Sequence, residues 1–164
     1  ALGHALAVAL MRARNFSAEE FGRFHPGGHL GRSLRVTVGE VLHGPGEVAW
    51  AKPDDSLKQV VIAMSRYPLG AACVVDASGR LAGLITDGDL RRALEAHDDI
   101  RGMSARDAMT SHPISIGPAA RLFDALRVME DRPSQISVLP VVDPATGACL
   151  GLLRLHDIYR AELG

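Results

Sequence analysis

An internal repeat constrains this chain more than any other feature of its sequence. The segment "SLKQVVIAM" aligns with "RLFDALRVM", which places Met64 opposite Met129, 65 positions later. The segment "GLITDGDL" aligns with "GLLRLHDI", which places Asp89 opposite Asp157, 68 positions later. Between these segments, "CVVD" matches "PVVD". The offset drifts where loops are expected, so the two copies predict one supersecondary unit used twice.

Each copy predicts the order strand, helix, strand, strand, helix. The expected strands are "EVAWA", "AACVVD" and "LAGLIT" in the first copy and "PISI", "SVLPVVD" and "CLGLLR" in the second. The closing helices are "DGDLRRALEA" and "LHDIYRAEL", and a capping box from Ser56 to Gln59 starts the first helix of copy one. The predicted fold class is α+β, with helices covering one face of each sheet. A unit of about 60 residues is marginal alone, so the copies are expected to pack on each other.

Composition excludes several classes of function. The formal net charge of −1 argues against a general polyanion binder, so no nucleic-acid partner is expected. No apolar run is long enough to span a membrane, and no pattern of a secretory signal is present. Cys73 and Cys149 lie in apolar, strand-like runs without CxxC spacing. They are interpreted as small buried hydrophobes in a reducing compartment, which favours a cytoplasmic location.

The first 35 residues do not belong to the repeat. They begin "ALGHALAVAL" with an apolar stripe at helical spacing and no initiating Met, which suggests a piece cut from a longer protein. Later, His25 and His29 stand four residues apart in "FHPGGHLGRSL". The Pro-Gly-Gly between them is incompatible with two metal ligands on one helical face, and a phosphate loop would need a lysine and a preceding strand. From the residues alone, a hinge after a helix is the simplest interpretation.

The repeat resembles the cystathionine-β-synthase-type (CBS) domain, which usually occurs as a tandem pair. The matching marks are "CVVD", "PVVD" and "GLITDGDL", in the same order in both copies. On this resemblance, residues 37–97 form copy one and residues 104–164 form copy two. CBS pairs commonly dimerise through their helices, so the resemblance implies a homodimer.

The front segment, residues 1–35, resembles the last helices of the sugar isomerase (SIS) domain in arabinose 5-phosphate isomerases. Those proteins carry a CBS pair directly after that domain. The resemblance implies a bacterial parent enzyme that interconverts ribulose 5-phosphate and arabinose 5-phosphate for Kdo and lipopolysaccharide synthesis. A tetramer is one expected assembly of that parent. The resemblance also makes His25 an active-site residue of the parent, because a histidine can move a proton near neutral pH. This chain alone is expected to be inactive, because the sugar-phosphate pocket would belong to the rest of that domain.

Thr86 and Asp89 are the main candidates for ligand binding. In CBS domains the aspartate of this motif commonly binds ribose hydroxyls, and the helix that starts at Asp87 adds free N–H groups. The same two residues also fit a capping box, and both interpretations can hold together. Ala71 and Ala72, at the start of the preceding strand, complete the candidate set in copy one.

Copy two departs from this pattern. Arg154 replaces the threonine, although Asp157 remains. Its guanidinium could fill the cleft, pair with Asp157 or bind a phosphate. We therefore expect one good ligand site, built around copy one, and one altered or empty site.

The ligand itself is left open by the sequence. No cofactor is required; the resemblance favours a regulatory nucleotide such as AMP or ATP, and pathway logic suggests CMP-Kdo. No metal site is predicted, because "DGD" at residues 87–89 lacks the further oxygen ligands of a calcium loop. The alternative function is a structural module that only holds the isomerase together and has no physiological ligand.

Overall fold

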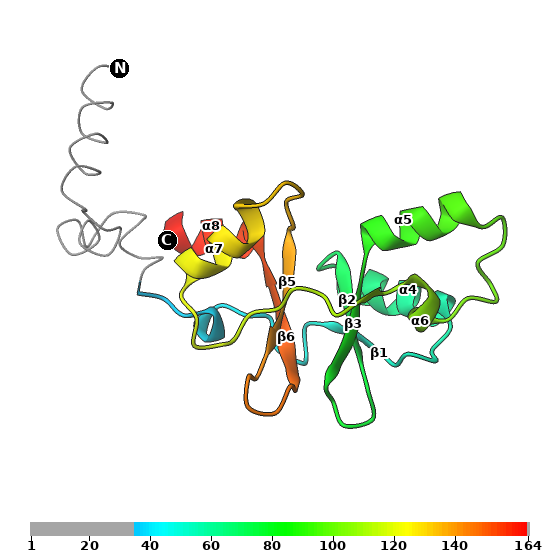
Figure 1. Ribbon diagram of the computed structural model, residues 1–164, viewed down its shortest axis with the longest axis horizontal. Coiled ribbons are helices and arrows are strands. Elements are labelled where there is room, and N and C mark those ends of the chain that lie inside the picture. The colour runs from blue at the N-terminus through cyan, green and yellow to red at the C-terminus, as the bar shows by residue number, and fades with distance from the viewer. Residues whose placement is uncertain (1–34, 164) are drawn as a thin grey trace, which may run out of the picture.

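The computed structural model describes residues 35–163, and the side chains of residues 35–161. His25 and the rest of the front segment lie outside the described residues. In chain order the elements are η1 (Val38–Glu40), β1 (Ala49–Ala51), α4 (Leu57–Arg66), β2 (Ala71–Val75), β3 (Leu81–Thr86), α5 (Asp87–Ala96), α6 (Ala105–Ala108), β4 (Thr110–Ser111), α7 (Leu122–Glu130), β5 (Val138–Val142), β6 (Cys149–Arg154) and α8 (Leu155–Leu163). The predicted tandem α+β fold is confirmed (Figure 1).

The strands form two sheets, one in each copy. In copy one, β1 pairs with β2 in parallel, and β2, β3 and β4 follow as antiparallel neighbours. In copy two, β5 and β6 form an antiparallel hairpin. Both hairpins have the same register irregularity, between Val74 and Val75 in β2 and between Val141 and Val142 in β5. The sequence repeat is therefore a structural repeat down to the pairing of single residues.

The expected strand "PISI" is wrong as a strand. Only Ile116 keeps a pairing, as an isolated parallel bridge to Val141 that matches the pairing of Ala51 with Val74 in copy one. The Ile116 amide donates to the carbonyl of Pro140 at 3.0 Å. Pro113, the first residue of "PISI", has no N–H to give to a ladder, which shortens the pairing at this edge.

Each copy begins with a leading segment, which contains η1 in copy one and α6 in copy two. In space the two leading segments are exchanged, so that each packs on the other copy. The amide of Val38, in η1, donates to Ala120 of copy two at 2.8 Å, and Val38 is fully buried in the core formed by α7, β5 and α8. Conversely, Ala105, in α6, donates to Asp55 of copy one at 2.8 Å and is fully buried in the core under α4 and α5. Figure 1 shows η1 beside α7 and α6 beside α4. Each copy therefore completes the hydrophobic core of the other.

A third core joins the copies. It contains Leu84, Leu152 and Cys73, with Cys149 packed against it. The hairpin tips also meet, because the amide of Cys149 donates to the carbonyl of Gly79 at 3.0 Å. Burial of these apolar side chains on both copies fixes their relative position, as expected for units too small to be stable alone.

Helix caps set where the site-bearing elements begin. The capping box of Ser56 with Gln59 is confirmed at the start of α4, and Thr86 with Asp89 forms the equivalent box at the start of α5. Each box satisfies free backbone N–H groups of the first turn and so fixes the strand-to-helix junction. Among the described residues, no helix combines the length and apolar character that a membrane span requires.

Candidate ligand-binding site between the two copies

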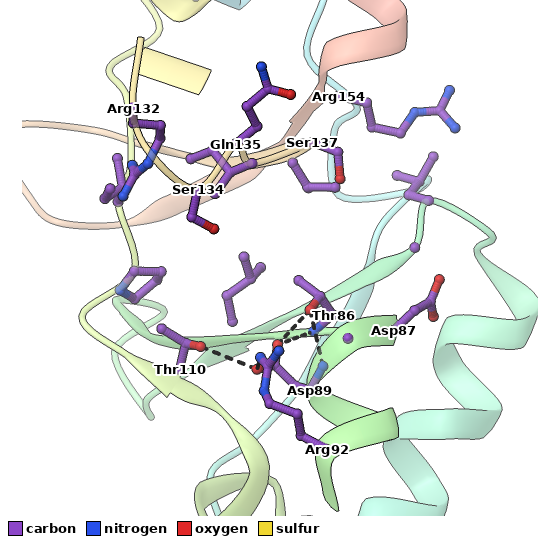
Figure 2. A pocket seen from close by; sticks show the side chains of 18 of the residues that line it. Thr86, Asp87, Asp89, Arg92, Thr110, Arg132, Ser134, Gln135, Ser137 and Arg154 are labelled. Atoms are coloured by element: carbon purple, nitrogen blue, oxygen red, sulfur yellow. Dashed lines mark hydrogen bonds and ion pairs between the residues drawn. The ribbon is translucent and has the colours of Figure 1, made fainter. Parts of the chain in front are cut away.

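A cavity of about 660 Å³ lies between the copies, and both contribute to its walls (Figure 2). Copy one provides the end of β3 and the start of α5, with the segment around β4 beside them. Copy two provides the loop from α7 to β5 and the end of β6. The polar side chains of the lining are Thr86, Asp87, Asp89, Arg92, Thr110, His112, Arg132, Ser134, Gln135, Ser137, Arg154 and His156.

Asp89 lies on the copy-one wall with an exposure of only 7%. One carboxylate oxygen, Oδ2, accepts from the Thr86 amide at 2.8 Å and from the Thr86 hydroxyl at 2.6 Å. The other, Oδ1, accepts from the Thr110 hydroxyl at 3.3 Å and from the guanidinium of Arg92. The side chain of Arg92 is 68% exposed, so this contact can open at little cost. The capping role of Asp89 is thus real, and Oδ1 is the oxygen that a ligand hydroxyl could reach.

Asp157 occupies the equivalent place in copy two and is contacted by the guanidinium of Arg154 and the imidazole of His43. Arg154 donates two hydrogen bonds to this carboxylate: Nε donates to Oδ2 and Nη2 donates to Oδ1, each at 2.8 Å. His43 Nε2 lies 2.9 Å from Oδ2. Burial would raise the pKa of Asp157, but the hydrogen bonds from Arg154 and His43 outweigh it and lower the pKa below its usual value. Of the three roles considered for Arg154, pairing with Asp157 is the one that the structure shows.

Three arginines line the cavity, and two of them have an ion-pair partner among the described residues. Arg92 is paired with Asp89, and Arg154 with Asp157. Arg132 lines the same cavity, and its buried Nε atom has no hydrogen-bond partner among the described residues. Buried N–H groups are normally paired, so the unpaired Nε of this half-buried arginine requires an explanation.

The structure brings three of the candidate residues to the cavity. Thr86, Asp89 and Arg154 line it, and Asp157 lies behind Arg154. Ala71 and Ala72 do not line it: both are fully buried in β2, where they pair with Thr86 and Ile85 of β3. Their role is structural: they pair with the end of β3 and so hold Thr86 in position beside the cavity.

Several lining residues were missed by the sequence analysis. Thr110 and His112 come from the exchanged segment, which the repeat alone assigns to copy two. Arg132 and Gln135 come from the loop before β5. His112 has a φ of 54°, a left-handed conformation that is uncommon outside glycine and often marks functional sites.

One signal for the loop was present in the sequence. From Met129 to Val138 the chain is two residues longer than from Met64 to Ala71, the matching stretch of copy one. The longer stretch reads "EDRPSQIS", which is polar where the repeat predicts a simple connection. A polar insertion in one copy of a repeat is typical of binding loops.

Comparison with protein families gives a match over most of the chain. The model of the CBS domain family matches residues 38–96 and 105–164. The two matched ranges correspond to the two copies and together exceed half of the chain.

Curated relatives extend the likeness to the front segment. Arabinose 5-phosphate isomerase KdsD of Pseudomonas aeruginosa is 42% identical over 160 residues, which cover 98% of this chain and 48% of that protein. KdsD of Yersinia pestis is 39% identical over the same length and with the same coverage. The chain therefore spans about half the length of the curated relatives it matches.

Solved structures show the same fold. CBSX2 in complex with AMP has a TM-score of 0.65 at 25% identity, covering 77% of this chain and 96% of that one. The CBS pair of MJ0100, solved with 5′-methylthioadenosine and S-adenosyl-L-methionine, has a TM-score of 0.66 at 24% identity, covering 76% of this chain and 94% of that one.

Proposed function

The chain belongs to the CBS domain family, and we propose that its two copies form a regulatory module that binds a nucleotide or nucleotide-sugar in the cavity between them. The observation that carries this proposal is the shared cavity of about 660 Å³. Its size is within the range of small-molecule sites, and polar groups from both copies converge on it. A ligand held there would contact both copies and so couple binding to their relative position.

The relatives suggest what the module regulates. We infer that the parent protein is an arabinose 5-phosphate isomerase in the bacterial cytoplasm, with His25 in its active site. The likeness to KdsD over 98% of this chain supports this, including residues 1–35 that the repeat does not explain. A downstream nucleotide-sugar such as CMP-Kdo, or an adenine nucleotide of the kind named for CBSX2, would then act as effector.

A homodimer of the module is part of this proposal. The helices of copy one leave three large apolar side chains exposed, Val61 and Ile62 in α4, at 37% and 53%, and Leu94 in α5 at 60%. A second copy of the chain would bury them and gain their hydrophobic transfer energy. Analytical ultracentrifugation tests this: Ile62→Asp should shift a dimer to monomer, whereas a wild-type monomer would contradict it.

One observation favours the alternative function, a structural module without a ligand. The Asp89 carboxylate already accepts four hydrogen bonds from the chain itself. A ligand hydroxyl would have to displace Arg92 or share Oδ1 with Thr110. The structural role therefore predicts full stability and full oligomerisation with no ligand response.

A thermal-shift and calorimetry screen separates the two functions. The wild-type chain is mixed with AMP, ATP, S-adenosylmethionine and CMP-Kdo, each against a buffer control of equal ionic strength. A ligand of the cavity, at a hundredfold excess over its dissociation constant, should stabilise the fold by about 2.7 kcal/mol. The absence of any shift or heat with all four compounds would reject the regulatory function and support the structural one.

A further inference from the structure

We propose that Arg132 is the receptor for an anionic group, a phosphate in particular, on the ligand of this cavity. The inference rests on the proposed function, because it assumes that the cavity holds a ligand, and it adds the chemical class of that ligand. On this proposal the loop from α7 to β5, residues 131–137, gives the cavity its preference for phosphorylated over neutral ligands.

The first support is the state of the Arg132 side chain. Its Nε atom is buried and without a hydrogen-bond partner among residues 35–163, and no ion pair of Arg132 occurs in that part of the chain. An unsatisfied buried donor destabilises the protein, and more so when it is charged. A ligand oxygen that accepts a hydrogen bond from this donor would remove that unfavourable term. The unpaired donor therefore favours binding of an anionic ligand group at Arg132.

The second support is that the other cavity arginines are occupied. Arg154 is held by Asp157 through two hydrogen bonds of 2.8 Å, and Arg92 is paired with Asp89. Arg132 is the cavity arginine for which the described residues hold no ion-pair partner. Its planar guanidinium matches two oxygens of a phosphate.

The third support is the surroundings of Arg132. Figure 2 shows Arg132, Ser134 and Ser137 on the copy-two wall, across the cavity from Thr86, Asp89 and Thr110, while the side chain of Gln135 extends away from that opposite wall. The serine hydroxyls can add neutral donors to an anion near Arg132. The stretch from Met129 to Val138 that includes this loop is two residues longer than the matching stretch from Met64 to Ala71 in copy one. The two copies therefore line the cavity with different connections.

A purely structural explanation of Arg132 also exists. The residue follows the last turn of α7, which ends at Glu130, where a cation stabilises the helix dipole. That role would make Arg132 matter equally for the fold with or without ligand. It would not make AMP affinity depend on Arg132 while adenosine affinity does not.

The experiment is isothermal titration of the 164-residue chain with AMP and with adenosine, which differ by one phosphate. In the wild type, AMP should bind at least about tenfold more tightly than adenosine. Arg132→Gln should weaken AMP roughly 10- to 100-fold, the range of a charged hydrogen bond, and leave adenosine within about twofold. The wild-type affinity for AMP should also fall with added salt more steeply than that of Arg132→Gln.

The matched control is Arg106→Gln. Arg106 is an exposed arginine paired with Asp54 on the surface, and it is not among the cavity residues. Its replacement should change neither affinity. Circular dichroism melts of both variants check the fold, and Arg132→Lys, which keeps the charge, should recover part of the AMP affinity.

The outcomes separate the two proposals. Equal binding of AMP and adenosine in the wild type, or equal losses for both in Arg132→Gln, would overturn the role of Arg132 and leave the ligand cavity in place. If none of AMP, ATP, S-adenosylmethionine and CMP-Kdo binds the wild type, the ligand cavity is rejected and the role of Arg132 falls with it.

Discussion

The Nε2 atom of His43 lies 2.9 Å from Oδ2 of Asp157, although 114 positions separate the two residues in the chain. The contact has a counterpart in copy one, where the Thr110 hydroxyl lies 3.3 Å from Oδ1 of Asp89. Both contacts cross between copies, because His43 and Thr110 belong to the exchanged leading segments. The same backbone arrangement thus places an imidazole from the other copy beside one aspartate and a hydroxyl from the other copy beside the second.

This difference predicts opposite effects of two matched substitutions. Asp157→Ala leaves Arg154 and His43 without their carboxylate and should lower the free energy of unfolding by about 2–4 kcal/mol, somewhat below the range for a fully buried pair. Asp89→Ala removes a capping box and should cost only about 1–2 kcal/mol, but it should remove most nucleotide binding. Urea denaturation followed by circular dichroism, with AMP titrations beside it, measures both. Equal losses of stability and of binding in the two variants would contradict the asymmetry.

The ion pair of Asp157 also predicts how stability depends on pH. Because folding lowers the pKa of Asp157, its carboxylate stabilises the fold above the unfolded value of about 3.9. This contribution is lost as the pH falls through the folded pKa. The stability difference between wild type and Asp157→Asn should therefore be full at pH 6–7 and shrink below about pH 4. Asp54→Asn, at an exposed surface pair, is the control. A difference that stays constant down to pH 3 would show that the charge of Asp157 does not contribute.

Gly83 and Gly151 occupy equivalent positions in the two copies, and substituting each of them tests how tightly the exchanged segments pack. A Cβ atom on Gly151 would overlap the backbone carbonyl of His43, whereas a Cβ atom on Gly83 would mainly meet the flexible side chain of Met109. Gly151→Ala should therefore destabilise the fold by about 3 kcal/mol and Gly83→Ala by about 1 kcal/mol, at the two ends of the range for overpacking. Chemical denaturation gives both values. A larger cost for Gly83→Ala would show that the contact with His43 is not rigid.

The two cysteines should differ in reactivity. Cys73 is fully buried, and its hydrogen bond with Cys149, together with burial, raises the pKa of its thiol. Cys149 is only partly buried, and the hydrogen bond from Cys73 lowers the pKa of its thiol. Because the thiolate is the reacting form, iodoacetamide should label Cys149 first and Cys73 only slowly. Peptide mapping by mass spectrometry measures this, and in Cys149→Ser the remaining thiol should react mainly after unfolding in urea. Faster labelling of Cys73 in the native protein would refute the order.

Local sequence determined the elements that bear the site. The bounds of β3, β6, α5 and α8 were predicted to the residue, because apolar strand runs end directly at helix-starting residues there. The capping box at Thr86 and Asp89 was visible for the same reason: its chemistry acts over three residues. The edge strand "PISI" failed because pairing at an edge depends on a neighbour that local pattern does not specify, and Pro113 limits it.

The sequence by itself therefore determined the repeat, the fold of each copy and the two aspartates, since these follow from periodicity and from contacts between near neighbours. Tertiary structure alone decided which residues from distant parts of the chain lie beside each aspartate. Which copy η1 and α6 join, the pairing of His43 with Asp157 and the cavity shared by Thr86 and Arg132 depend on how two marginal units bury each other's apolar surface. That burial is non-directional and acts over the whole interface, so no short stretch of sequence encodes it.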